Sequence, residues 1–497
     1  MLRVLFCTPL WIVLNRLLNH FRIGKSESNV SENRPSGINI LIENTAVLLL
    51  DDDFTVVDPG WVAVSGDVIK EVGSGAPPAG VRECAETVID GSGTATMPGM
   101  TNAHTHLFQT FFRGLGDDKS LLDWLEHCIW PGAVHLDAHT AKLAAMVGLI
   151  ENLRTGATSV IDHQYIHIDE SIDDAICEAA DELGVRFLLA RGWADRNYEP
   201  SLTETHEQVI ERTRTVRDKW HGANNNLITI ELAPLIPWGC SDEAMSQTIS
   251  KSRSWGAGTH IHCAETHTEV QMSIEERGLR HVEWLSQLGA LGPDTQLAHS
   301  VWLDDHELDL IAESGSIVVH CPVSNMYLAS GVPRILDMID MGIPVALASD
   351  GPGSNNRQDM FEVLKATILL QKVHNLNPTA LQPEDALTMA CRGGARALGK
   401  ETQIGQIASD YKADLIVVDL ETVFTAPVHS VASSLVFCAS PSQVRHVIVD
   451  GQLLIQDSML LGLNEMDILA QANEVAQKLF AKAGIESRLT RSPEATN

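Results

Sequence analysis

Residues 97–115 read MPGMTNAHTHLFQTFFRGL, and two histidines stand where the short apolar segment in this stretch ends. We expect residues 99–104 to form a β-strand that leads into His104, Thr105 and His106. Side chains two positions apart in a strand point to the same side, so both imidazoles can face one ion. A single pair of this kind also occurs in ordinary cores. It therefore indicates a metal site only if further ligands follow at equivalent places.

Short apolar segments alternate with helical patterns through the middle of the chain. Eight strand candidates lie at about residues 99–104, 157–162, 185–190, 227–233, 257–263, 296–299, 316–320 and 344–349. The stretches between them, such as residues 137–154 and 169–183, carry apolar residues at helical spacing. Eight strands that alternate with helices over roughly 300 residues are typical of a (β/α)8 TIM barrel. We therefore predict a catalytic barrel over residues 98–401.

The two ends of the chain have a different hydrophobic pattern. Residues 38–76 and 413–457 contain short alternating apolar and polar runs with turn signals between them, which predict antiparallel hairpins. We expect one β-sandwich domain built from both ends. The predicted division of the chain is a disordered leader and linker at 1–37, the β-sandwich at 38–97 plus 402–460, the barrel at 98–401, and a C-terminal helix and tail at 461–497.

The composition describes an acidic globular protein. Among 497 residues, 35 are Lys or Arg and 65 are Asp or Glu, which gives a net charge of −30 at pH 7. Nucleic acids and anionic membranes carry charge of the same sign, so neither is expected as a partner. The nine cysteines are scattered without a CxxC pair and indicate no disulfide framework. We expect a cytoplasmic protein, although the apolar run at residues 4–14 leaves membrane targeting or secretion open, and a homo-oligomer is also left open.

Further side chains that can bind a metal ion stand at the ends of later strand candidates. His260 and His262 end the fifth, with Glu265 three residues beyond, His299 ends the sixth, and Asp350 follows the eighth. Active sites of (β/α)8 barrels lie at the carboxyl ends of the strands. Imidazoles with one carboxylate suit zinc or iron better than calcium or magnesium. The sequence therefore predicts a metal centre, with zinc expected and iron as the alternative.

Five segments together resemble the amidohydrolase superfamily. They are MPGMTNAHTHLFQTFFRGL, HIHCAET, AHSVWL, HCPVSNMYLASG and ASDGPGSNN. Within the superfamily, the chain resembles the branch that contains triazine hydrolases, S-adenosylhomocysteine/methylthioadenosine deaminases and 8-oxoguanine deaminases. The resemblance spans residues 38–480. It implies a metal-bearing barrel beside a β-sandwich.

Carried over by position, the resemblance also implies roles for single residues. One divalent ion would be held by His104, His106, His262 and Asp350. Binuclear relatives carry a carboxylated lysine at the end of strand four, and the corresponding segment ITIELAPLIPW contains no lysine, so a single ion is expected. Glu265 matches the glutamate that shuttles a proton, His299 the histidine that positions the attacking water, and Asp350 would also serve as the base. His260 is expected to support the ligands or to pack.

Residues expected to contact the substrate are Gln109, Asp123, His163, Arg191 and His320. The Gln109 amide can pair with a polar ring edge. Asp123 stands where adenosine-type deaminases carry a glutamate that holds the ribose, and Leu235 replaces a histidine of those enzymes. These two departures favour a small free heterocycle, such as 8-oxoguanine, a pterin or a triazine, which would react with water and release ammonia.

Three alternatives to this substrate class stay open. A nucleoside deaminase of the S-adenosylhomocysteine/methylthioadenosine type is one, and a triazine hydrolase that releases an alkylamine or chloride is another. A barrel that has lost its metal and serves as a structural protein is disfavoured, because all six core positions of the site are present.

Overall fold

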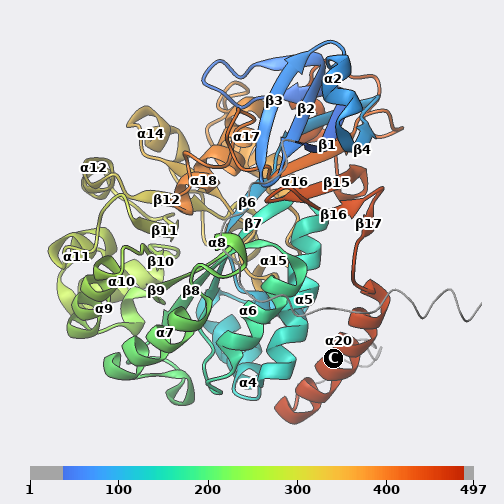
Figure 1. Cartoon of the computed structure of the whole chain (residues 1–497). Helices are drawn as coiled ribbons and strands as arrows, with labels where there is room; N and C mark the ends of the chain where they lie inside the picture. Colours follow the sequence, from blue (N-terminus) through green and yellow to red (C-terminus); the bar gives the residue numbers. More distant parts are fainter. Residues whose placement is uncertain (1–36, 486–497) are drawn as a thin grey trace, which may run out of the picture. The chain divides into compact units, whose positions relative to one another are not determined.

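The computed structural model describes residues 37–485. The predicted leader, apart from Gly37, and the end of the predicted tail lie outside the described residues. Within them, the middle of the chain forms eight parallel strands in two sheets of four (Figure 1). The first sheet has the order β6(Met100–Thr105), β7(Ala157–Gln164), β8(Arg186–Trp193) and β9(Ile228–Pro234). The second has the order β10(Thr259–Cys263), β11(Thr295–His299), β12(Ile317–His320) and β13(Val345–Leu347).

All eight strands form where the apolar segments of the sequence predict them. Every residue of β7, β8 and β10 is buried, so burial does not alternate along these strands as it would in a sheet with one face in solvent. A backbone hydrogen bond joins the two sheets at each of the two seams between their edge strands. The amide of His262 donates to the carbonyl oxygen of Leu235 at 3.2 Å, and the amide of Asp350 donates to the carbonyl oxygen of His104 at 3.0 Å.

Helices follow the strands and cover the two sheets (Figure 1). Those of ten or more residues that lie between strands are α5(Ala138–Arg154), α6(Ile172–Leu183), α7(His206–Trp220), α9(Asp242–Ser254), α10(His267–Arg277), α12(Asp305–Ser314) and α16(Met360–His374). The shorter ones are α3(Leu121–Trp124), α4(Trp130–Ala133), α8(Ala223–Asn226), α11(His281–Gln287), α13(Pro322–Tyr327), α14(Ile335–Asp340), α15(Pro352–Asn355), α17(Pro383–Thr388), α18(Gly394–Ala397) and α19(Val431–Phe437).

The helix starts follow local sequence. Asp137 caps α5 by accepting from the amide of Thr140, and Thr205 forms a capping box with Gln208 at the start of α7.

Strands from both ends of the chain pair in one nine-stranded sheet. Its order is β17(Met459–Leu460), β16(Gln452–Gln456), β15(Val444–Val449), β14(Leu415–Asp419), β5(Thr94–Pro98), β1(Ile38–Leu48), β2(Val56–Ser65) and β3(Val68–Ser74), with β4(Ala85–Asp90) paired to β1. The contribution of both ends agrees with the sequence. The ladders join all nine strands, however, so the two separate sheets of a sandwich remain a prediction.

Two further α-helices lie outside the two parallel sheets. α2(Ala79–Glu83) lies between β3 and β4, and α20(Glu465–Ala483) is the C-terminal helix expected from residues 467–482. α20 contacts α5 and α4, so it packs on the helices around the parallel strands. None of the helices between residues 37 and 485 is long and apolar enough to cross a membrane.

Candidate active site

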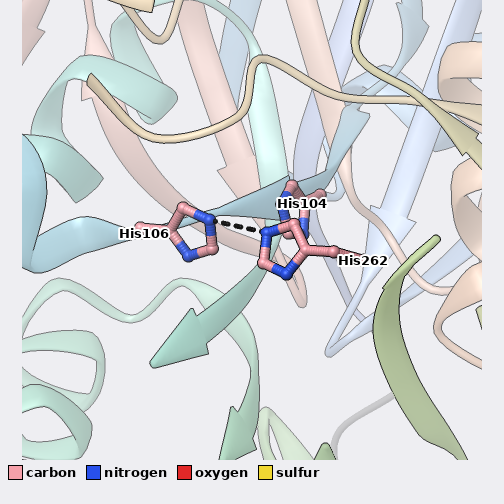
Figure 2. Close-up of side chains that lie close together, drawn as sticks. All are labelled: His104, His106 and His262. Atoms are coloured by element: carbon pink, nitrogen blue, oxygen red, sulfur yellow. Dashed lines mark hydrogen bonds between the residues drawn. The ribbon is translucent and has the colours of Figure 1, made fainter. Parts of the chain in front are cut away.

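Three histidines from two strands meet at the carboxyl ends of the parallel sheets (Figure 2). His104 lies in β6, His106 directly follows it, and His262 lies in β10. One ring nitrogen from each lies within 4.8 Å of those of the other two, and all three side chains are buried. Burial lowers the pKa of His104 and of His262 well below the ordinary histidine value, so both rings are neutral at neutral pH.

The hydrogen bonds of two of these rings fix which nitrogen is free. Nδ1 of His106 lies 2.7 Å from the carbonyl oxygen of His163, and Nδ1 of His262 lies 2.7 Å from that of Leu235. A carbonyl oxygen can only accept, so Nδ1 carries the hydrogen in both rings. With Nδ1 carrying the hydrogen, Nε2 of such a ring is the nitrogen available to bind an ion, and the two Nε2 atoms face each other at 3.2 Å.

Two facing lone pairs are repulsive unless a cation lies beside them. Nε2 of His104 adds to this arrangement, because it is buried and has no hydrogen-bond partner. The donor set therefore fits a divalent ion bound by three imidazoles.

Asp350 faces the same centre from beyond β13. Its Oδ1 lies 3.2 Å from Nε2 of His106 and 3.4 Å from Nε2 of His104. Its Oδ2 accepts hydrogen bonds from the hydroxyls of Ser324 at 2.6 Å and Ser354 at 2.7 Å. Burial alone would raise the pKa of Asp350, but the two imidazoles bring that pKa well below its usual range. The carboxylate is therefore ionised and oriented toward the histidines.

Glu265 and His299 lie at the same centre, and one nitrogen of His299 is within 4.8 Å of ligand atoms of His104 and Asp350. His299 ends β11 and its Nδ1 lies 2.9 Å from Oδ1 of Asn325, while its Nε2 has no hydrogen-bond partner. Oε1 of Glu265 accepts from the hydroxyl of Ser330 at 3.1 Å. Burial, followed by the charge of Asp350, raises the pKa of Glu265 to about 8. This carboxyl group can therefore hold a proton at neutral pH.

The backbone at two of these positions is strained. His299 has a φ of 69° and Asp350 a φ of 63°. Residues with side chains rarely adopt this left-handed region, and they do so most often where function requires a side chain to be aimed.

A pocket opens above the cluster. Its floor contains His106, His262, Glu265, His299 and Asp350. Its walls are apolar or aromatic and consist of Leu121, Trp124, Leu125, Tyr165, Tyr198, Leu235, Ile236, Trp238 and Leu328. Such walls suit a flat, uncharged ring.

Two residues expected to contact substrate are held by protein groups instead. The amide nitrogen of Gln109 donates to the hydroxyl of Tyr165 at 2.9 Å, and its oxygen accepts from the amide of Gly353 at 3.2 Å. The Arg191 guanidinium is fully buried between Asp173 and Glu204. Neither residue lines the pocket, so their positions do not support the expected contacts.

The remaining expected contacts lie near the pocket without lining it. His163 is buried inside the histidine cluster, with its ring stacked at 4.9 Å on that of His262. His320 ends β12, and neither of its ring nitrogens has a hydrogen-bond partner. Asp123 is exposed on α3, which also supplies Leu121 and Trp124 to the pocket wall, and it accepts from the hydroxyl of Ser120 at 2.7 Å.

The residues that orient the acidic groups are those that sequence reasoning missed. Ser324, Asn325, Ser330 and Ser354 contact Asp350, His299 or Glu265. All four stand in the segments HCPVSNMYLASG and ASDGPGSNN, directly after strands of the second sheet. That placement is the available signal, since polar residues just beyond parallel strands point toward the site.

Comparison with known proteins agrees with this geometry. A model of the amidohydrolase family matches residues 95–454. The chain is 38% identical over 447 residues to a 5'-deoxyadenosine deaminase of Methanosarcina mazei, a match that covers 89% of this chain and 99% of the relative. It is 32% identical over 444 residues to a 5-methylthioadenosine/S-adenosylhomocysteine deaminase of Syntrophomonas wolfei, covering 89% of this chain and all of the relative.

A solved structure extends the likeness to three dimensions. The crystal structure of an adenosine deaminase from Xanthomonas campestris with bound zinc superposes with a TM-score of 0.83 at 29% identity. That match covers 89% of this chain and 99% of the other. The family model spans most of the chain, and the relatives match nearly their whole length. The chain therefore belongs to the amidohydrolase family and is a hydrolase that acts on C–N bonds.

Proposed function

We propose that this protein is a metal-dependent deaminase that converts the amino group of an adenine nucleoside to an oxo group and releases ammonia. The observation that carries the proposal is Glu265, a buried carboxyl group that can hold a proton, beside three imidazoles and Asp350 at the floor of an aromatic pocket. The names of the relatives support a nucleoside, which sequence reasoning ranked second. Nothing in the comparisons supports the free oxo-purine that it ranked first.

We infer that His104, His106, His262 and Asp350 hold a single divalent ion, with zinc expected. The facing lone pairs of the imidazoles and the ionised Asp350 support this ligand set. When bound, such an ion lowers the pKa of a coordinated water from about 15.7 towards about 7. We also infer that the two parallel sheets close into one (β/α)8 barrel, which the hydrogen bonds at both seams support.

The chain's own groups move the protons. Glu265 donates a proton from its carboxyl group to the ring nitrogen beside the carbon under attack, which makes that carbon more electrophilic. His299 lies at the floor of the pocket, and its Nε2 orients the attacking water. Asp350 accepts the proton that the water loses and passes it to the amino nitrogen, which leaves as ammonia. The proton left on the attacking oxygen returns to the Glu265 carboxylate, so water and the amino-substituted ring are converted to an oxo-substituted ring and ammonia.

The pocket walls favour a substrate with little polarity beyond its ring. Trp238 and Tyr198 stand with ring centroids 5.8 Å apart, and Leu235 and Ile236 lie beside them. A nucleoside that lacks a hydroxyl at its 5′ carbon leaves no unpaired polar group against such walls. We propose that Asp123, on the helix that also supplies Leu121 and Trp124, accepts from the ribose hydroxyls.

An ammonia-release assay with zinc-loaded protein tests the proposal. The panel contains 5′-deoxyadenosine, 5′-methylthioadenosine, S-adenosylhomocysteine, adenosine, adenine, 8-oxoguanine and a triazine. We expect the highest kcat/KM with an adenine nucleoside whose 5′ group is apolar. Higher kcat/KM for a free base than for every nucleoside would refute the nucleoside assignment while leaving the deaminase chemistry intact.

A variant of Asp123 separates ribose recognition from ring recognition. D123A should raise KM for nucleosides about tenfold, because a hydrogen bond to a charged acceptor is lost. It should leave KM for free adenine unchanged, since adenine has no ribose. S120A is the matched control, because Ser120 contacts the Asp123 carboxylate but carries no charge itself.

A further inference from the structure

A chain of buried polar side chains leads from the histidine cluster toward the other end of the parallel strands. Nδ1 of His104 lies 2.7 Å from Nε2 of His260, and Nδ1 of His260 lies 2.8 Å from Oε1 of Gln296. The amide of Gln296 in turn lies beside the carboxyl group of Glu231. All four side chains are at least 92% buried, and they come from β6, β10, β11 and β9.

The chemistry of the groups fixes the direction of each hydrogen bond in this chain. The amide oxygen of Gln296 can only accept, so Nδ1 of His260 carries the hydrogen. A ring that carries its hydrogen on Nδ1 and donates it to Gln296 has a lone pair on Nε2, the nitrogen that lies beside His104. Nδ1 of His104 must then donate to it. In neutral His104 this leaves Nε2 unprotonated, and that is the nitrogen beside Asp350.

The orientation of the Gln296 amide depends on Glu231. Oε2 of Glu231 and Nε2 of Gln296 lie next to the backbone of Gly258, where an added Cβ would lie 2.9 Å from the first atom and 3.3 Å from the second. The donor side of the amide therefore lies on the Gly258 side, where Glu231 also stands, and its acceptor side faces His260. Both protonation states of Glu231 offer an accepting oxygen, so this orientation does not depend on its charge.

We propose that Gln296, held by Glu231, is a positioning residue that sets the tautomer of His260 and through it the tautomer of the metal ligand His104. The functional consequence is that Nε2 of His104 is available to bind the ion before the ion arrives. Ligand histidines are commonly oriented by a group on their second nitrogen, and loss of such a group lowers metal affinity by about 10- to 100-fold. Here the orienting group acts through a second imidazole.

The series of polar side chains from His104 to Glu231 ends at a second cavity, on the side of the strands opposite the pocket. Glu231, Gln296 and Gly258 line this cavity together with Asp294 and Lys400. Oε1 of Glu231 has no hydrogen-bond partner among the described residues. Glu231, the last side chain of this series, therefore lies far from the reacting atoms. A substitution of Glu231 removes no contact with the substrate.

Zinc affinity of the metal-free protein, measured by competition with a chromogenic chelator, tests the proposal without any substrate. Q296L removes the acceptor and should weaken zinc binding by about 10- to 100-fold. In the double variant Q296E/E231Q, the new carboxylate at position 296 accepts from His260, and the new amide at position 231 donates to that carboxylate. This variant should therefore recover most of the zinc affinity that Q296L loses. A structural role alone would not predict this recovery.

The tautomer itself gives a second measurement. Protein labelled with ¹⁵N-histidine should show a single His104 tautomer with hydrogen on Nδ1, assigned by comparison with H104N. Q296L should shift these signals toward a mixture of tautomers. E231M keeps Gln296 and its contact with His260, so it should shift the His104 signals to a smaller extent. If Q296L does not fold, E231M tests the proposal in its place.

The outcomes separate this proposal from the proposed function. Wild-type zinc affinity and an unchanged His104 tautomer in Q296L would overturn it, whatever the substrate proves to be. Two zinc ions per chain would also overturn it, because His104, His163 and His260 would then share a second ion. Failure of every nucleoside in the ammonia assay leaves it intact.

Discussion

Oε2 of Glu265 lies 3.6 Å from Nε2 of His299, although the two residues follow different strands. The separation leaves the two groups side by side at the pocket floor without a tight ion pair between them. One can therefore donate a proton to the substrate ring while the other contacts the water. This arrangement underlies the first prediction.

Substitution of Glu265 should separate proton transfer from metal binding. E265Q should retain its zinc, since Glu265 is not a proposed ligand, and should lose about 10²- to 10⁴-fold in kcat. Metal analysis and ammonia release on the same sample measure both. A variant with near wild-type turnover would remove Glu265 from the mechanism.

The activity should fall as the pH rises through about 8. The pKa of Glu265 is raised to about 8, so the carboxyl group is protonated below that pH and can donate. Above it the group is ionised and the proton is gone. A profile of kcat against pH should show this loss in the wild type, and the residual activity of E265Q should lack it. The same loss in both proteins would assign it to another group.

Zinc should depend on the histidine cluster. Purified protein should hold about one ion per chain, and H262A should hold less than the wild type, because one of three imidazoles is missing. H306A is the matched control, since His306 is exposed on α12. Equal zinc content in H262A and wild type, or full activity after exhaustive chelation, would contradict the proposed site.

Arg191 should matter for stability and not for substrate binding. R191M removes the fully buried cation that Asp173 and Glu204 share and leaves Glu204 with only Arg212, which should cost about 3–5 kcal/mol of folding free energy and lower the Tm. R214M, which breaks an exposed pair with Glu211, should change the Tm little. An unchanged Tm in R191M with a raised KM would return Arg191 to the substrate site.

Removal of residues 1–35 should leave the enzyme folded and active. The first strand among the described residues begins at Ile38, which agrees with the predicted start of the β domain. Thermal unfolding and ammonia release of the truncated protein test this expectation. Insolubility of that protein would place the domain boundary nearer the N-terminus.

The sequence predicts the eight parallel strands and the histidine cluster for the same reason. A strand buried on both faces is mostly apolar, and a polar side chain at its carboxyl end is therefore conspicuous. The interpretation of the chain as an amidohydrolase of the deaminase and triazine hydrolase branch, and as an enzyme, is confirmed by the comparisons. The ligand and proton-transfer roles stay predictions until they are tested.

The surroundings of Arg191 and Gln109 could not be predicted from the sequence, because they depend on side-chain direction and on contacts between distant segments. Leu188 and Ala190 pack together in the core inside the sheets, so Arg191 points the other way, toward Asp173. Its expected contact with substrate stays untested, and the alternation within the strand explains why its side chain does not line the pocket. The contacts of Gln109 with Tyr165 and Gly353 join three separate segments, which no local spacing reveals.

The pairing of β14 with β5 has a consequence for synthesis of the protein. Leu415 pairs with Pro98 and Asp419 with Thr94, so the strand that β5 needs on one side is encoded after the whole catalytic region. While the ribosome makes residues 99–414, that edge of β5 has no partner from its own chain. An edge of this kind can pair with a neighbouring nascent chain. A polypeptide that stops before residue 415 should therefore aggregate, even though every proposed metal ligand has already been made.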